Sequence, residues 1–290
     1  MIDLHCHLLP GIDDGAADLS VSLAMAKESA TQGVEVIACT PHILPGLYHN
    51  TGPAIREATQ NLQNILDEEG IPLQLVAGAD AHMTPDFVPG LHSGHILALA
   101  DSRYVLVEPP HHTAPPQMEE FFFSLTLAGY VPILTHPERL SWVPSRYETI
   151  KKLFHAGVWM QITAGSFTGA FGRNALYWAQ RMLDEGYVHL IASDAHDAVR
   201  RRPDLAAGRE CVAKRVGADE AERLVSTRPM AVLQDHPPSS VQAPTGVVAD
   251  GEGVSHPQDT RQSRSGQSSR DGRPAHGLRG LAGRLRHIFD

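Results

Sequence analysis

The sequence predicts an α/β protein whose parallel strands close into a (β/α) barrel. Short apolar strands alternate with helices about seven times over residues 1–235, and the connecting loops are short. Nearly every predicted strand ends on a histidine, an aspartate or a glutamate. In a barrel the C-terminal ends of all strands meet on one face, whereas an open, doubly wound sheet gathers its ligands at one switch point. The barrel therefore explains the sequence better.

The N-terminal strand carries the first groups with metal-binding chemistry. Side chains alternate along a strand, so His5 and His7 lie on one face and Cys6 on the other. A Pro/Gly turn then brings Asp13 and Asp14 towards the histidines. An isolated His-x-His pair is more often one buried and one solvated histidine. The recurrence of histidines and acids at later strand ends favours a metal site.

Caps, turns and β-branched runs predict the other elements. Asp18 and Gly33 are a typical N-cap and a typical C-terminal glycine of the first helix, and Pro53 and Gly70 mark the start and end of the second. We expect helices at residues 18–33, 53–69, 116–128, 145–156, 173–185, 204–216 and 218–226. We expect strands at residues 2–7, 34–40, 73–80, 104–108, 131–135, 158–163 and 188–193.

Charge and composition exclude several classes of protein. Residues 236–290 contain seven arginines and five acidic residues, which leaves a net charge of −11 on residues 1–235. A nucleic-acid-binding surface needs a basic footprint, so we expect no nucleic-acid partner. The sequence has no apolar run of about 18 residues that would span a membrane. The N-terminus leaves no room for a signal peptide, and three distant cysteines fit a reducing compartment, so we expect a cytoplasmic protein.

The composition changes at His236, where Pro, Ser, Gly, Gln and Arg become dominant. Such a stretch cannot bury enough apolar area to offset its ordering entropy, so we predict a disordered linker at residues 236–277. Our hypothesis is that residues 278–290 form a short amphipathic helix and that this helix docks on a membrane surface or on a partner. The alternative is a frayed end or a cap on the barrel itself. The apolar residues that recur with helical spacing are Leu278, Leu281, Leu285 and Ile288.

Imidazoles and carboxylates at the strand ends form the candidate metal site. The set contains no group of thiolates, which favours Mn, Fe or Zn over a structural zinc site. So many ligands suit two or three ions with bridging carboxylates, and such clusters activate water and bind phosphoryl oxygens. The candidates are His5, His7, Asp13 or Asp14, His42, Asp80, Glu108, His136, Asp194 and His196. His82 could add to this site, and His111 and His112 could line its mouth.

Five motifs carry a resemblance to a known family. They are His-Cys-His (5–7), Leu-Pro-Gly-Ile-Asp-Asp-Gly-Ala (9–16), Thr-Pro-His (40–42), His-Pro-Glu-Arg (136–139) and Ser-Asp-Ala-His (193–196). Together with residues 161–169 they resemble the PHP (polymerase and histidinol phosphatase) superfamily, and within it the bacterial protein-tyrosine phosphatases of the CpsB/YwqE type. The resemblance implies a distorted (β/α)7 barrel over residues 1–235 and a manganese site, with three ions, although Fe or Zn would also fit. It also implies phosphotyrosine as substrate, on the tyrosine autokinase of a capsule or exopolysaccharide export system.

The resemblance also assigns individual residues. Arg139 and Arg202, which precedes a proline, would bind the phosphate. The run Arg200–Arg202 leaves open which guanidinium does so. Asp80 departs from the family's usual glutamate, and its shorter side chain could lose a bridging contact. The implied metal ligands are His5, His7, Asp14, His42, Asp80, Glu108, His136, Asp194 and His196.

The sequence also bears on several alternative functions. A thiol phosphatase needs an arginine six residues after its cysteine, and Cys6, Cys39 and Cys211 all lack one. A PHP phosphatase acting on a small phosphomonoester, such as histidinol phosphate, remains an alternative, as does a non-catalytic metal-binding module that interacts with the kinase. A nuclease-type PHP domain is disfavoured by the acidic body of the chain.

Overall fold

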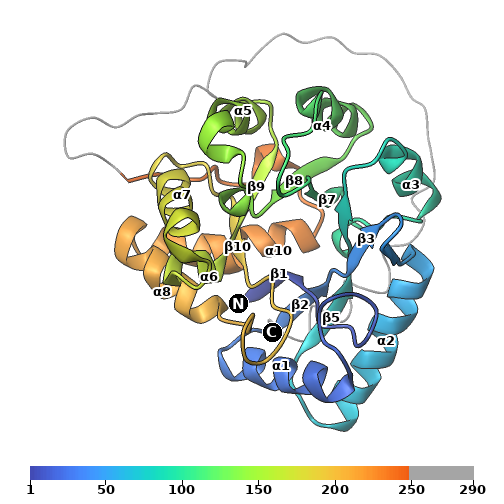
Figure 1. Cartoon of the computed structure of the whole chain (residues 1–290). Helices are drawn as coiled ribbons and strands as arrows, with labels where there is room; N and C mark the ends of the chain where they lie inside the picture. The colour runs from blue at the N-terminus through green and yellow to red at the C-terminus, as the bar shows by residue number, and fades with distance from the viewer. Residues whose placement is uncertain (248–290) are drawn as a thin grey trace, which may run out of the picture. The chain divides into compact units, whose positions relative to one another are not determined.

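The computed structural model describes residues 1–247, where every apolar segment expected to be a strand forms one (Figure 1). In six of these strands every residue is buried, which explains their continuous apolar runs. The strands are β1 (Ile2–Cys6), β2 (Val36–Cys39), β3 (His42–Leu44), β4 (Tyr48–His49), β5 (Gln74–Ala77), β6 (Asp80–His82), β7 (Tyr104–Glu108), β8 (Val131–Thr135), β9 (Trp159–Thr163) and β10 (Leu190–Ala192).

The strands form two sheets that together make a closed ring. One sheet has the order β1-β2-β5 and the other β10-β9-β8-β7-β6-β3-β4. A break at Thr40–Pro41 separates β2 from β3, and a break at Gly78–Ala79 separates β5 from β6, so each pair is one interrupted strand. A parallel bridge between Cys6 and Ala195 joins β1 to the chain after β10. Counted this way, the described residues form a distorted (β/α)7 barrel, which confirms the predicted fold class.

The helices lie around the outside of the strands (Figure 1). Asp18 is the N-cap of α1, as predicted, and its side chain accepts a hydrogen bond from the backbone N–H of Val21. Two short helices near the strand ends, α3 and α6, were not expected. The helices are α1 (Leu19–Thr31), α2 (Gly52–Glu68), α3 (Phe87–Ser93), α4 (Met118–Leu127), α5 (Val143–His155), α6 (Ala164–Thr168), α7 (Gly172–Asp184), α8 (Leu205–Val216), α9 (Ala218–Glu222) and α10 (Arg228–Leu233).

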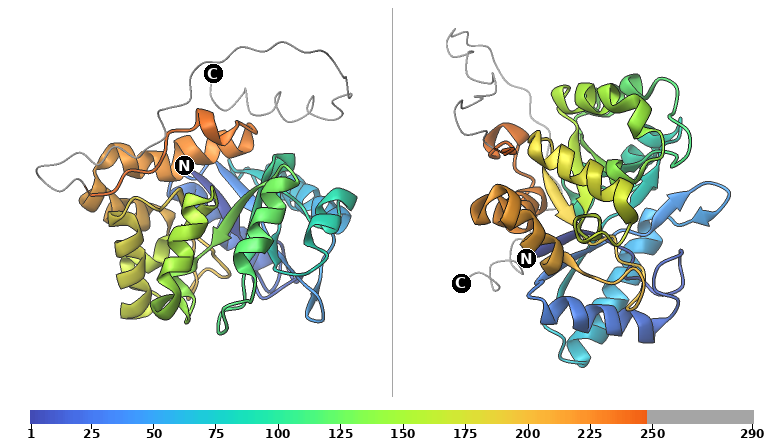
Figure 2. Two further views of the ribbon diagram at one scale, coloured as in Figure 1. Left: turned by 90° about the horizontal axis from the view of Figure 1, so that it is seen from above. Right: turned by 60° about the vertical axis from the view of Figure 1, so that its left-hand side comes forward.

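The chain continues in ordered form past residue 235, where we expected the linker to start. Figure 2 shows the orange segment that includes α10 lying across one end of the barrel. Buried Arg228 pairs with Glu220 at 2.8 Å and donates to the carbonyls of Gln242 and Ala243. These contacts hold residues 236–247 against the barrel, although their composition is typical of a linker. The rest of the predicted linker and the predicted helix at 278–290 lie outside the described residues.

Within residues 1–247, no helix is both long enough and apolar enough to cross a lipid bilayer. The proposed membrane contact of the C-terminal segment falls on residues that the structure does not describe.

Candidate metal centre

The nine expected ligands converge at the C-terminal ends of the strands. His5 belongs to β1, His42 begins β3 and Glu108 ends β7. The side chain of each of the nine lies within 3.6 Å of another member of the set. The convergence follows from the barrel, in which consecutive parallel strands deliver their last residues to one face.

Two of the ligands adopt a backbone conformation that non-glycine residues rarely take. His136 follows β8 with φ 33°, and Asp194 follows β10 with φ 50°. Such left-handed residues cost of order 1–3 kcal/mol and are often found at functional sites. Here they turn each side chain sharply from the strand end into the cluster.

One side of the cluster is built around Asp194. Its Oδ1 lies 3.5 Å from His5 Nε2 and 3.4 Å from His7 Nε2, and the two imidazole nitrogens are 3.2 Å apart. Asp80 Oδ2 lies 3.4 Å from His5 Nε2. All four side chains are buried, so an ion placed among their donors would be shielded from water.

The other side of the cluster is built around His42 and Glu108. His42 Nε2 lies 3.4 Å from Asp14 Oδ1, and His42 Nδ1 lies 3.3 Å from Glu108 Oε2. Glu108 Oε1 faces His136 Nε2 at 3.5 Å. His196 Nε2 completes this side, 3.6 Å from Asp14 Oδ1. His42 and Glu108 each direct two ligand atoms to different neighbours, which is the arrangement expected when ligands serve adjacent ions.

Several donors of the cluster have no hydrogen-bond partner, although they are buried. An unpaired buried polar atom costs free energy, and native proteins rarely leave one without a purpose. Bound divalent cations would give such atoms the partners that they lack, so the residues present fit a metal centre. The unpaired atoms are His42 Nδ1, both carboxylate oxygens of Asp80, His136 Nδ1 and His196 Nε2.

Neighbouring groups orient the histidines. Asp13 Oδ2 lies 2.7 Å from His7 Nδ1 and also accepts the backbone N–H of His42, whereas Asp14 faces the open cluster. Gln161 Oε1 lies 2.9 Å from His5 Nδ1. A carboxylate or amide oxygen on the far nitrogen fixes the tautomer of a metal-binding histidine. The sequence left Asp13 and Asp14 as equivalent candidates, and the structure gives them different neighbours.

The surroundings of Glu108 favour its ionised form. Burial would raise the pKa of Glu108, but hydrogen bonds and attraction from the surrounding histidines hold it well below its usual range. Burial would lower the pKa of His7, but its hydrogen bonds to Asp13 and Asp194 raise it to about 10. Burial and repulsion from His7 lower the pKa of His196 to about 4. The site thus concentrates negative charge and attracts cations of either kind, protons or metal ions.

Two arginines approach the cluster: Arg139, as expected, and Arg201 from the run Arg200–Arg202, within which the sequence left the choice open. Arg139 Nη1 pairs with Asp194 Oδ2, and its guanidinium lies 4.5 Å from the centre of the Phe171 ring. Arg201 Nη2 lies 2.7 Å from the same carboxylate oxygen. Arg202 instead pairs with Glu28 at 3.2 Å on the surface. Arg201 and Arg202 are adjacent, and their side chains point in different directions. The sequence alone could not show which of the two faces the cluster.

Two histidines outside the expected set also contact Glu108. His82 Nε2 lies 2.5 Å from Glu108 Oε2, and His111 Nε2 lies 3.1 Å from Glu108 Oε1. Four groups of side chains have ligand atoms close enough together to share an ion: His7, Asp14, His42 and His196; His5, His7 and Asp80; His42, His82 and Glu108; and Glu108, His111 and His136. The position of His82, two residues after Asp80, was the sequence feature that indicated a place for it near the site.

Comparison with known proteins places the chain in a family. The family model described as capsular polysaccharide synthesis, CpsB/CapC, matches residues 1–234. Tyrosine-protein phosphatase YwqE of Bacillus subtilis is 37% identical over 201 residues, which cover 69% of this chain and 79% of YwqE. Tyrosine-protein phosphatase CpsB of Streptococcus pneumoniae is 29% identical over 240 residues, which cover 81% of this chain and 99% of CpsB.

A solved structure agrees with this placement. A crystal structure from the pair YwqE of Bacillus subtilis and CpsB of Streptococcus pneumoniae, described as unique metal-dependent tyrosine phosphatases, superposes with a TM-score of 0.80 at 32% identity. The match covers 86% of this chain and all of that one. A family model over most of the chain, a relative above 30% identity and the shared barrel agree: the chain belongs to the CpsB/CapC family.

Proposed function

We propose that this protein is a metal-dependent phosphatase that hydrolyses phosphotyrosine on a bacterial tyrosine kinase of a polysaccharide export system. One observation carries the proposal: histidines and carboxylates from the strand ends of the barrel converge in a buried cluster, and several of their ligand atoms have no hydrogen-bond partner. The relatives named as tyrosine-protein phosphatases and the metal dependence stated for the YwqE and CpsB structures support it. The family's description supports the link to capsular polysaccharide.

The ligand chemistry supports manganese, with three ions in the cluster. Mixed imidazole and carboxylate donors suit Mn²⁺, Fe²⁺ or Zn²⁺. His5, His7, Asp14, His42, Asp80, Glu108, His136, Asp194 and His196 would hold the ions. When bound, the ions supply an activated water and polarise the phosphoryl oxygens.

Two arginines beside the cluster, Arg139 and Arg201, would bind the phosphate. Arg139 is positioned by Asp194 and by the ring of Phe171, and Arg201 reaches the same carboxylate from the loop between β10 and α8. Guanidinium groups pair with phosphoryl oxygens in bidentate fashion and stabilise the charge that develops on them. A tyrosine phenolate has a solution pKa of about 10, so it leaves with little help from a proton donor. We therefore assign no general acid.

The test is a substrate panel run with metal-stripped and metal-reloaded protein. We expect turnover of a phosphotyrosyl peptide with Mn²⁺, none after chelation, and far weaker turnover of a phosphoseryl peptide and of histidinol phosphate. The variant Asp194→Ala should lose metal and turnover together while the circular dichroism spectrum stays that of the native protein. Preferred turnover of histidinol phosphate would instead support a small-molecule phosphatase. Metal binding without turnover of any of these substrates would support a non-catalytic module.

A further inference from the structure

His82 lies beside the metal centre without belonging to the expected ligand set. It ends β6, the short strand that starts with Asp80, and residues two apart on a strand share one face. Its Nε2 lies 2.5 Å from Glu108 Oε2, and its ring centre is 5.2 Å from that of His42. The side chain is 18% exposed. His82 therefore points into the cluster from the same strand, and on the same side, as Asp80.

The two sides of the cluster differ in which side chains provide metal-ligand atoms. Asp80 groups with His5 and His7, and its Oδ2 lies 3.4 Å from His5 Nε2. On the other side, His42 Nδ1 has no hydrogen-bond partner, and Glu108 Oε2 lies 3.3 Å from His42 Nδ1 and 2.5 Å from His82 Nε2. The third member of that group is His82. Without His82, this group would be reduced to the His42–Glu108 pair, whereas an ion of this class takes four or more ligands.

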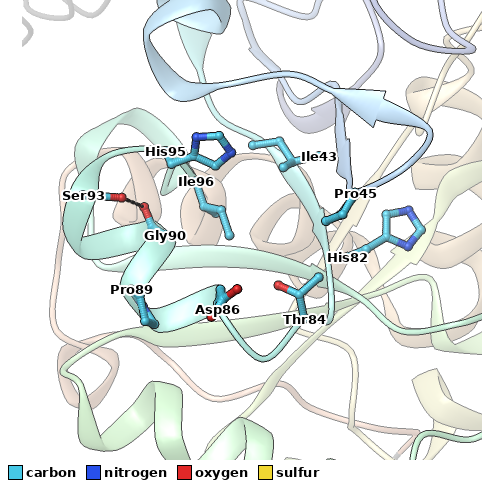
Figure 3. Close-up of a pocket in the computed structure, with 10 residues that line it drawn as sticks. All are labelled: Ile43, Pro45, His82, Thr84, Asp86, Pro89, Gly90, Ser93, His95 and Ile96. Atoms are coloured by element: carbon cyan, nitrogen blue, oxygen red, sulfur yellow. Dashed lines mark hydrogen bonds between the residues drawn. The ribbon is translucent and has the colours of Figure 1, made fainter.

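The surroundings of His82 support a role at the cluster. His82 lines a cavity of about 510 Å³ together with His95 and Ile96. Figure 3 shows that its ring turns away from the other lining residues, whereas His95 lies on a separate side of the cavity. The imidazole thus forms part of the wall between the cavity and the cluster. A histidine that served only to line the cavity would have no need to approach Glu108.

We infer that His82 is a metal ligand, which binds the ion held by His42 and Glu108 and compensates for the short reach of Asp80. The inference rests on the metal centre of the proposed function and adds an imidazole to it. Asp80 Oδ2 lies 3.4 Å from His5 Nε2 and 3.5 Å from His42 Nδ1, so its carboxylate faces both of these histidines, whereas His82 faces Glu108. One strand then supplies a ligand to each side of the cluster.

The first test compares metal binding by His82→Ala and His95→Ala. His95 lines the same cavity and is not among the residues grouped for ion binding, so its variant is a matched control. Both proteins would be stripped, reloaded with Mn²⁺, desalted and analysed for metal per chain, followed by Mn²⁺ titration. We expect His82→Ala to retain fewer ions and to bind the weakest one at least 10–100-fold less tightly. Equal metal content and affinity in His82→Ala and the native protein would overturn the inference.

A second measurement separates a ligand from a structural histidine. We expect Mn²⁺ to raise the melting temperature of His82→Ala less than that of the native protein, while the two proteins melt alike in EDTA. A structural role predicts the reverse, a lower melting temperature in EDTA and an unchanged rise with Mn²⁺. His82→Gln keeps a hydrogen-bonding group of similar size, so a structural role predicts normal Mn²⁺ binding and a ligand role predicts weaker binding.

A double variant tests whether His82 compensates for Asp80. Glutamate at position 80 is longer by one methylene and should extend towards His42 and Glu108. We expect His82→Ala/Asp80→Glu to recover the metal content that His82→Ala loses, and an absence of recovery would contradict the compensation. None of these measurements depends on phosphatase activity. If the native protein fails to bind metal, the proposed metal centre fails; if only the variants behave unexpectedly, the assignment of His82 fails alone.

Discussion

The adjacent residues Arg201 and Arg202 allow a sharp test of the phosphate site. Arg201 Nη2 lies 2.7 Å from Asp194 Oδ2 and its side chain is 29% exposed. Arg202 pairs with Glu28 at 3.2 Å, and these two side chains are 56% and 39% exposed. The two arginines have the same charge and adjacent positions, so their alanine variants control for each other. We expect Arg201→Ala to lose most of the phosphatase activity and Arg202→Ala to keep it.

The expected magnitudes follow from these environments. Removal of one positioned donor to developing negative charge typically costs about 10²–10³ in kcat, or roughly 3–4 kcal/mol of transition-state stabilisation. An exposed ion pair contributes about 0–1 kcal/mol to folding and nothing to the reaction, so Arg202→Ala should change kcat/KM by less than about twofold. Rates would be measured on a phosphotyrosyl peptide at saturating Mn²⁺, together with metal content.

Two results would refute this reasoning. A large loss of activity in Arg202→Ala with Arg201→Ala unaffected would return the phosphate site to the arginine expected from the sequence. A loss of metal from Arg201→Ala in proportion to its activity would show that Arg201 acts only by holding Asp194, with which it pairs.

The other predictions are simpler to test. Chelation should abolish activity and Mn²⁺ restore it, whereas iodoacetamide should have little effect, because Cys6 and Cys39 are buried and burial raises the pKa of both thiols, that of Cys39 to about 12. Asp80→Glu should keep or raise kcat at saturating Mn²⁺, and a fully metallated but inactive variant would show that the site depends on the shorter side chain. Burial and the nearby Asp3 raise the pKa of Asp204 to about 6, so Asp204→Asn should stabilise the EDTA-treated protein by about 1 kcal/mol at pH 8 after allowance for solvent screening. That gain should shrink as the pH falls through 6, because native Asp204 then becomes neutral, and urea unfolding from pH 8 to 5 would detect a gain that fails to shrink. Deletion of residues 248–290 should leave hydrolysis of a small aryl phosphate unchanged.

Local patterns in the sequence predicted most of the barrel because they match local physics. The continuous apolar runs are buried strands, and the Asp18 cap begins α1 where expected. The split of one predicted strand into β5 and β6 was not visible, because Gly78 and Ala79 interrupt the pairing without interrupting the apolar pattern. The order of residues 236–247 was also missed. It depends on buried Arg228, whose partners are distant carbonyls rather than neighbours in the sequence.

In the candidate site, too, some features could be predicted from the sequence and others depend on contacts between distant residues. Its expected members could be found because a barrel brings strand ends together, whichever residues lie between them. The sequence could not show the direction of a side chain within a loop. Arg201 and Arg202 differ only in which way the backbone turns them, and Asp13 and Asp14 differ only in which histidine each one faces. The direction of each of these side chains depends on packing against residues that are distant in the sequence.

The closure of the barrel sets the order in which the parts of the cluster can form during synthesis. Asp3 in β1 accepts the backbone N–H of Ser193, 190 residues away, and Cys6 forms the bridge to Ala195. A ribosome adds about 5–20 residues per second, so roughly 10–40 s separate the synthesis of the two ends of this contact. During that interval one edge of β1 lacks its partner strand, and the nascent chain holds His5 and His7 without Asp194. Three of the four groups of ligand atoms lie within residues 5–136, whereas the group that includes His196 can be completed only after the last strand has left the ribosome.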